Sequence, residues 1–154
     1  MNLNPTFEEA VDFFKNNELL CEDIDVWAAD RNLPMVHYVS CGLLTPKGER
    51  TPMIVELFIK VSPKTQDKHY KFTVLRRETF GQRRYYQLDV RITKKPVKDE
   101  HALPHEHFGK ERLKGAEEWK SWQYSDVLAH FCEQTRIHFN PMPVDPDTFD
   151  LRGY

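Results

Sequence analysis

Hydrophobic residues recur at helical spacing near both ends of the chain. Residues 7–16 carry one apolar stripe, which predicts an amphipathic helix. Thr6 followed by Glu9 matches a capping box, so Thr6 is its predicted N-cap. A second helix is predicted over residues 124–137, with Ser125 as N-cap. The apolar face of this second helix consists of Leu128, Phe131, Cys132 and Thr135.

Between these helices the period of the pattern changes to two, which is typical of strands. The alternating segments are 35–44, 52–62, 69–78 and 84–93. Short turns separate them, and this favours antiparallel neighbours. In the last segment the residues predicted to face outward are Tyr85, Gln87, Asp89 and Arg91. We therefore predict an α+β fold: an antiparallel β-meander of four to five strands, with an N-terminal and a C-terminal helix packed on one face.

The length of 154 residues predicts a single domain. We expect this α+β domain to comprise residues 1–139, because prolines at 141, 143 and 146 exclude a continuous helix after it. Residues 140–154 are predicted to form an extended Pro/Asp-rich arm, either docked on the domain or free to bind a partner. The residues expected to dock it are Met142, Val144, Phe149 and Leu151.

Composition narrows the class of protein. The net charge of -2 does not fit a general polyanion binder, although a local basic patch stays open. No apolar run approaches the ~20 residues that span a membrane, and the N-terminus lacks a secretory signal pattern. Cys21, Cys41 and Cys132 are widely spaced, which predicts reduced thiols. We expect a cytoplasmic protein with no membrane contact and no cofactor; no nucleotide-binding glycine loop or Gly-x-Ser-x-Gly motif is present.

The segment 19–32 alternates apolar and acidic residues and is ambiguous. It fits a short acidic helix or a loop that buries Trp27. Its carboxylates predict a solvated acidic face that could attract a cationic partner. The acidic residues are Glu22, Asp23, Asp25 and Asp30, with Glu18 directly before the segment.

The residues best suited to chemistry are His101, His105 and His107. Pro104 favours an extended approach to His105, so that His105 and His107 share one face and Glu106 lies on the other. Imidazole titrates near neutral pH and can act as acid, base or metal ligand. Three interpretations stay open: a solvated loop, a metal-free acid/base or phosphate-binding site, and a metal site completed by His101 or another ligand.

Positive charge concentrates in residues 76–98. Four arginines flank the turn between the last two predicted strands: Arg76, Arg77, Arg83 and Arg84. Arginine pairs with phosphate in a bidentate manner, and an aromatic ring such as that of Tyr85 can stack on a base. With Arg91, this hairpin is a predicted nucleic-acid-binding element. The alternative is a charged hairpin end that prevents aggregation of the sheet.

A family resemblance joins these features. Tyr-Tyr-x-Leu-x-Val-Arg at 85–91 precedes His101-x3-His105-x-His107, with Pro104 directly before the pair. A tryptophan-containing connection and a short C-terminal helix follow. Over residues 68–138 this arrangement resembles TumE-like proteins, the presumed toxin components of toxin–antitoxin modules, and related domains with a Pro-His-x-His motif. The resemblance implies a bacterial or phage-borne cytoplasmic protein that acts on RNA and is neutralised by a protein partner.

Three functional hypotheses follow. In the first, the protein is a metal-independent ribonuclease toxin: His105 or His107 accepts the 2′-OH proton, the other protonates the leaving oxygen, and the arginines hold phosphate. In the second, it is a non-catalytic interaction module, such as a phage or plasmid inhibitor of a bacterial defence enzyme, which binds through its acidic segment and arm. In the third, His101, His105 and His107 bind a metal ion.

Overall fold

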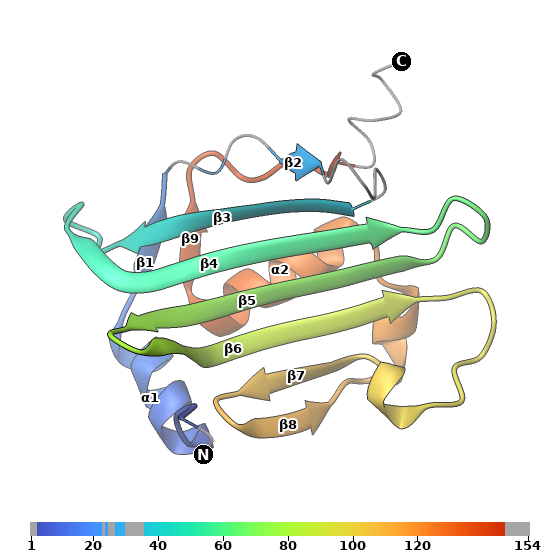
Figure 1. Ribbon diagram of the computed structural model, residues 1–154, viewed down its shortest axis with the longest axis horizontal. Helices are drawn as coiled ribbons and strands as arrows, with labels where there is room; N and C mark the ends of the chain where they lie inside the picture. The colour runs from blue at the N-terminus through green and yellow to red at the C-terminus, as the bar shows by residue number, and fades with distance from the viewer. Residues whose placement is uncertain (1–2, 23, 25–26, 30–35, 147–154) are drawn as a thin grey trace.

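One large sheet dominates the structure, a computed structural model that describes residues 3–22, 24, 27–29 and 36–146 (Figure 1). The strands assigned in these residues follow the order β8-β7-β6-β5-β4-β3-β1-β9, and β2 pairs with β3 off this path. Their bounds are β1 (Leu19–Cys21), β2 (Ala28–Ala29), β3 (Val36–Leu44), β4 (Arg50–Val61), β5 (Lys68–Glu78), β6 (Gly81–Ile92), β7 (His105–Phe108), β8 (Glu111–Lys114) and β9 (Ile137–Phe139). The helices are α1 (Phe7–Asn16) and α2 (Tyr124–Thr135), with 3-10 turns η1 (Glu100–Ala102) and η2 (Glu117–Ser121).

The centre of the sheet is the antiparallel meander that the alternation predicts. In β4, β5 and β6, Val55 pairs with Val74 and Val74 with Tyr86. The sheet is nevertheless larger than the predicted four to five strands, because β7 and β8 extend one side and β1 and β9 the other. β1 and β9 are parallel, so the sheet is mixed. These added strands are three or four residues long, too short to display a periodic pattern.

The core lies on one face of the sheet. Phe131 of α2 is fully buried, and its ring centroid lies 5.6 Å from that of Phe72 and 5.8 Å from that of Tyr86. At the corner of the sheet, Phe7 of α1 packs edge-on against Phe108 of β7. Figure 1 shows α2 behind the middle strands and α1 at the lower corner near the N-terminus. The α+β class is confirmed, but the predicted packing of both helices across one face is not clearly seen.

Local capping rules explain how the helices begin. The capping box of α1 is confirmed: the Glu9 backbone N–H donates to Thr6 Oγ1, and the Thr6 N–H donates to Glu9 Oε1, both at 3.2 Å. The N-cap of α2 is Gln123 rather than the predicted Ser125. Here the carboxylate of Asp126 accepts the Gln123 N–H at 2.9 Å, so the helix starts upstream of the serine.

The acidic segment and the arm meet each other. Within the described part of 19–32 the chain forms β1 and β2, whereas residues 23, 25–26 and 30–32 lie outside the described residues. The half-buried Trp27 donates its Nε1–H to the Val144 carbonyl at 2.7 Å, and the Tyr124 hydroxyl donates to the Pro143 carbonyl at 2.7 Å. The arm thus docks through its backbone up to residue 146.

The side chains predicted to dock the arm are exposed or lie outside the described residues. Met142 and Val144 were predicted to dock the arm, but both side chains are mainly exposed. Phe149 and Leu151 lie outside the described residues. Among the described residues, the helices are all too short or too polar to cross a membrane.

Candidate functional site

The face of β4–β7 opposite α2 is polar, and we call it the open face. Its side chains alternate with the buried core positions and include Glu56, Phe58, His69, Lys71, Thr73, Gln87, Asp89, His105 and His107. A concave groove of about 670 Å³ runs over it, lined in part by Tyr38, Phe58, His69, Lys71 and Gln87. The period-two pattern of the strands therefore produces a chemically equipped surface as well as the core.

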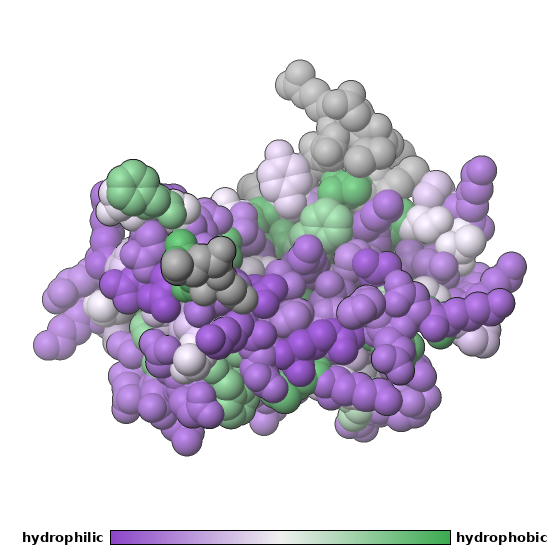
Figure 2. All heavy atoms as spheres, turned by 60° about the horizontal axis from the view of Figure 1, so that its bottom comes forward, coloured by the Kyte–Doolittle hydropathy of each residue, from purple (hydrophilic) through white to green (hydrophobic). Residues whose placement is uncertain are grey.

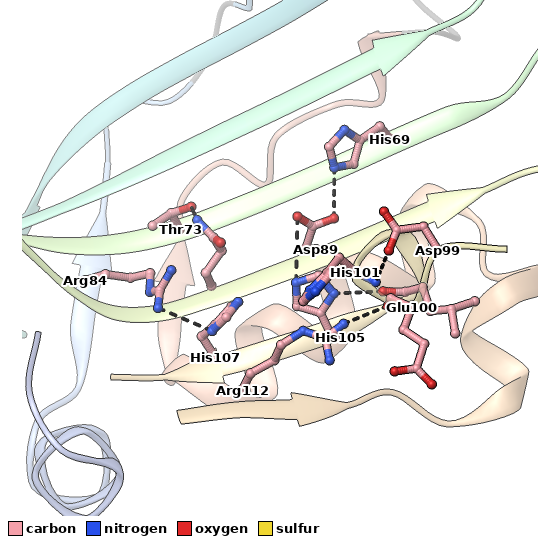
Figure 3. Close-up of polar contacts among 12 residues, drawn as sticks. His69, Thr73, Arg84, Asp89, Asp99, Glu100, His101, His105, His107 and Arg112 are labelled. Carbon is pink, nitrogen blue, oxygen red and sulfur yellow. Dashed lines mark hydrogen bonds and ion pairs between the residues drawn. The ribbon is translucent and has the colours of Figure 1, made fainter. Parts of the chain in front are cut away.

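Asp89 lies between two histidines at the centre of this face (Figure 3). His69 Nε2 is 2.8 Å from Asp89 Oδ1, and His105 Nε2 is 4.0 Å from Asp89 Oδ2. The three residues come from β5, β6 and β7, where Asp89 pairs directly with His105. Burial opposes ionisation of Asp89, but the hydrogen bond and charge of His69, aided by His105 and Arg91, prevail and lower its pKa. Asp89 is thus a carboxylate at neutral pH.

The neighbours of the two imidazoles fix their tautomers. His105 Nδ1 lies 2.7 Å from the Leu103 carbonyl, which can only accept, so Nδ1 carries a proton. His105 Nε2 then faces Asp89. Because ionised Asp89 can only accept, His69 donates through Nε2–H, and its Nδ1 is left as an acceptor. This is the arrangement of an oriented proton acceptor.

His107 has a different environment. Its Nδ1 lies 3.3 Å from Arg84 Nη2, and because a guanidinium can only donate, Nδ1 must accept. Burial first, and then the positive charge of Arg84, lower the pKa of His107 to about 4. His107 is consequently neutral at pH 7, with Nε2–H as a hydrogen-bond donor. Arg84 is itself held by the Gly109 carbonyl, 3.2 Å from Nη2.

Replacing His107 by Gln is expected to remove a pH-dependent loss of stability. The pKa of His107 is about 4 in the folded protein and near its ordinary 6.5 when unfolded, so between these values the unfolded state binds more protons. The wild type should therefore lose on the order of 1–2 kcal/mol of unfolding free energy relative to the variant as the pH falls through this window, allowing for partial exposure of the ring.

Urea unfolding between about pH 7 and pH 4 measures this difference. The matched control is His138→Gln, because the His138 side chain is 66% exposed and lies outside the site. Parallel stability curves for the wild type and His107→Gln would contradict the assigned environment of His107.

His101 does not join His105 and His107 in a metal-binding cluster. It is an exposed residue of η1, and its backbone N–H donates to the Asp99 side chain at 3.0 Å. Among the residues that the structure describes, no group of three or more His, Cys, Asp or Glu side chains is arranged to hold a metal ion. The three histidines of the third hypothesis are therefore not placed as a ligand set.

Strand alternation divides the arginines of the β5–β6 hairpin. Arg77 and Arg84 lie toward the open face, and Arg91 follows Asp89 on it. Arg76 and Arg83 pair with each other on the core side, where Arg83 Nε donates to the Leu3 carbonyl. The predicted group of four arginines is thus two pairs on opposite faces.

Tyr85 is not on the outward face as predicted. A bulge shifts the β5–β6 register between Val74 and Leu75, so that Tyr85 and Tyr86 are both buried. The Tyr85 ring packs against Phe13 of α1, with centroids 5.0 Å apart. Tyr85 is therefore not available to stack on a base.

Sequence reasoning missed His69 and Asp89 as site residues. The register of the β5–β6 hairpin places residue 69 opposite 91 and residue 71 opposite 89, whereas counting outward from the turn without the bulge gives 90 and 88. Both His69 and Asp89 then fall on the outward face, within diagonal reach of each other. Reaching this result required the correct register, including the bulge.

Glu106 points away from His105 and His107, as predicted. On the core side it accepts the Tyr86 hydroxyl at 2.7 Å and lies 3.1 Å from His130 Nε2. Burial, together with the charge of Glu106, raises the pKa of Tyr86 well above its ordinary value. Trp119 flanks the His130 ring, with centroids 4.7 Å apart. These contacts anchor β7, and so fix the positions of the two histidines on the open face.

Comparison with known proteins assigns the chain to no group. No family model matches it, and no curated protein or solved structure is significantly similar to it. The function must accordingly be inferred from the chemistry of the open face.

Proposed function

We propose that the open face binds single-stranded RNA and that His69, Asp89 and His105 cleave it by proton transfer. The observation that carries this proposal is one ionised carboxylate between two imidazoles on adjacent strands. Such an arrangement orients a base and holds a second histidine as a proton donor. Both functions are required to cleave RNA without a metal ion.

The charge of the open face supports a polyanionic ligand. The outward strand positions carry these basic residues: Lys60, Lys71, Arg77, Arg84, Arg91, Arg112 and Lys114. The acidic residues among them are Glu56 and Asp89. Figure 2, which brings the lower edge of the sheet forward, shows mainly hydrophilic side chains there. A positive face on a slightly acidic molecule would attract phosphates locally.

Aromatic rings on the same face favour a single strand over a duplex. Tyr38 is 50% exposed and pairs with Phe58 across β3 and β4. The Phe58 ring lies 5.8 Å from the His69 ring, edge to face. Unpaired bases can stack on such rings, as they do on other sheet surfaces, whereas bases in a duplex are covered by their neighbours.

Each step of the proposed reaction has a residue. His69 Nδ1 accepts the proton of a ribose 2′-OH, and the 2′-oxygen attacks phosphorus. The bond from phosphorus to the 5′-oxygen breaks, and protonated His105 gives its Nε2 proton to the leaving oxygen. The products are a 2′,3′-cyclic phosphate and a 5′-hydroxyl. His69 thereby takes the role of base, which the first hypothesis gave to His105 or His107.

The remaining polar groups stabilise charge. Arg84 and the neutral His107 lie together beyond Gln87 on the open face. The guanidinium and the His107 Nε2–H can donate to the non-bridging phosphate oxygens, on which negative charge builds up in the transition state. His107 acts as a donor in this scheme, because its lowered pKa makes it unsuited to carry the transferred proton.

This activity would make the protein toxic to the cell that contains it. RNA decay arrests growth, and a partner that covers the open face would neutralise the protein, in agreement with the role that the TumE-like resemblance implies. In this proposal the partner is an antitoxin protein. The acidic segment and the arm are not needed for the reaction.

Cleavage of a labelled single-stranded RNA by the purified protein tests the proposal. In the presence of a chelator, we expect RNA fragments that end in 2′,3′-cyclic phosphate by mass spectrometry, and no cleavage of DNA of the same sequence, which lacks the 2′-OH. His69→Ala should lower the rate by about 10²–10³-fold, because it removes the base. His138→Ala, a change in an exposed histidine outside the site, should retain the wild-type rate.

Two results would overturn the proposed activity. The first is intact RNA after incubation with the folded wild-type protein, which would favour the interaction-module hypothesis. The second is an undiminished rate for His69→Ala, which would assign the cleavage to other residues or to a contaminant.

A further inference from the structure

A basic pocket lies beside the proposed site, at the end of β6. It has a volume of about 320 Å³ and is bounded by the last residues of β6, the loop that follows and η2. Its cationic lining residues are Arg91, Lys94, Lys95 and Lys120. Within the described residues, no carboxylate lines it. The lining of the pocket therefore carries four positive charges and no carboxylate that would neutralise them.

The charges of this pocket are only partly neutralised by carboxylates of the described chain. Lys94 and Lys95 form no ion pair there, and Arg91 interacts beyond ion-pair distance with Asp89, whose pKa it helps to lower. Lys120 contacts Glu117 at 2.9 Å, but the Glu117 side chain is 86% exposed, so that pair is weak. Four cations held near one another repel, and a bound anion would relieve this repulsion.

The backbone that presents these cations is fixed by hydrogen bonds. The Thr93 hydroxyl donates to the Lys95 carbonyl at 2.8 Å, and the Lys94 N–H donates to the Asp67 side chain at 3.2 Å. Pro96 and Pro104, which also line the pocket, restrict the backbone conformation there. The backbone that carries Lys94 and Lys95 is thus held in place, while their side chains are exposed to solvent and to an incoming anion.

The pocket is a neighbour of the row of acid/base residues formed by His69, Asp89 and His105. Arg91 follows Asp89 by two residues on the same face, a rise of about 7 Å along the strand. Leu103 lines the pocket, and its carbonyl also holds His105 Nδ1. A phosphate in the pocket would lie close enough to the row for the neighbouring phosphodiester of the same strand to reach His69 and His105.

We infer that this pocket binds the terminal phosphate monoester of an RNA strand, so that the substrate is an RNA with a phosphorylated end. A phosphate monoester carries about -1.5 to -2 charge at pH 7, and its charge matches a four-cation pocket better than that of a singly charged diester. This inference rests on the proposed RNA binding by the open face. It adds a preference for one kind of strand end, and it places the cut next to that end.

Binding of non-cleavable oligonucleotides tests this inference separately from catalysis. The probes are 2′-O-methyl oligonucleotides of one sequence that bear a 5′-phosphate, a 3′-phosphate or hydroxyl groups at both ends. Fluorescence anisotropy should show about tenfold tighter binding for one of the phosphorylated forms. The Lys94→Ala/Lys95→Ala variant should lose this preference. Lys15→Ala/Lys47→Ala removes the same charge from exposed positions outside the pocket and should keep it.

The outcomes separate the two proposals. Equal affinity of the wild type for phosphorylated and hydroxyl ends, or a preference that survives Lys94→Ala/Lys95→Ala, would overturn the terminal-phosphate pocket while RNA cleavage stood. A preserved end preference without RNA cleavage would overturn the nuclease and leave the pocket. No binding of any oligonucleotide would overturn both.

Discussion

Replacing Asp89 by Asn is expected to lower the rate of RNA cleavage by about 10³–10⁴-fold, because its carboxylate orients His69 through a hydrogen bond and faces His105 at 4.0 Å. An amide is neutral and cannot stabilise a charged imidazolium. It also carries N–H groups that can donate to an imidazole nitrogen and favour the wrong tautomer. The same exchange in the Asp–His pair of a serine protease costs about 10⁴-fold.

Single-turnover cleavage rates measure this effect, and circular dichroism checks that the variant is folded. The matched control is Glu56→Gln, the same acid-to-amide change at an exposed position of the same face. It should leave the chemical step close to the wild-type rate. A wild-type rate for Asp89→Asn would contradict the central role of this carboxylate, even if RNA were cleaved.

Replacing Gly109 by Ala is expected to destabilise the fold by about 2–5 kcal/mol, the sum of a backbone and a packing cost. Gly109 has a φ of 61°, which alanine adopts only with strain. A Cβ atom there would collide with the Pro5 carbonyl oxygen and lie 2.8 Å from that of Thr6. These carbonyls belong to the backbone that starts α1, so they cannot move without disturbing the helix.

Gly48→Ala separates the two contributions. Gly48 also has a positive φ, 87°, but a Cβ atom there meets nothing within 4 Å. Its substitution should therefore show only the backbone cost of about 1–2 kcal/mol. Urea unfolding of both variants gives the comparison. Equal destabilisation by the two substitutions would show that the contact between the β7–β8 turn and the start of α1 contributes nothing to the stability of the fold.

The long central strands and the local motifs of this protein could be predicted from its sequence. The four central strands are nine to twelve residues each and repeat the alternation often enough to be recognised. The capping box at Thr6 and the opposite directions of Glu106 and His105 depend only on neighbouring residues. Such local rules need no knowledge of which strands are adjacent.

The features that failed depend on tertiary structure. The edge strands β7 and β8 are recognisable only once β6 offers them a partner. A single bulge turned Tyr85 into the core, against an otherwise correct alternation. The site itself joins His69, Asp89 and His105 across three strands, so its composition follows from register rather than from any contiguous motif.

The parallel pairing of Leu19 with Ile137 has a consequence for the order in which the protein can be built. Most of the described chain lies between these partners. A ribosome delivers β9 after every other described strand, so until then β1 is joined to the sheet through β3 alone, at Leu20 and Leu44. Long-range pairing of this kind slows folding. This side of the sheet must therefore close after most of the chain has been synthesised, and nascent chains would expose a core edge to chaperones.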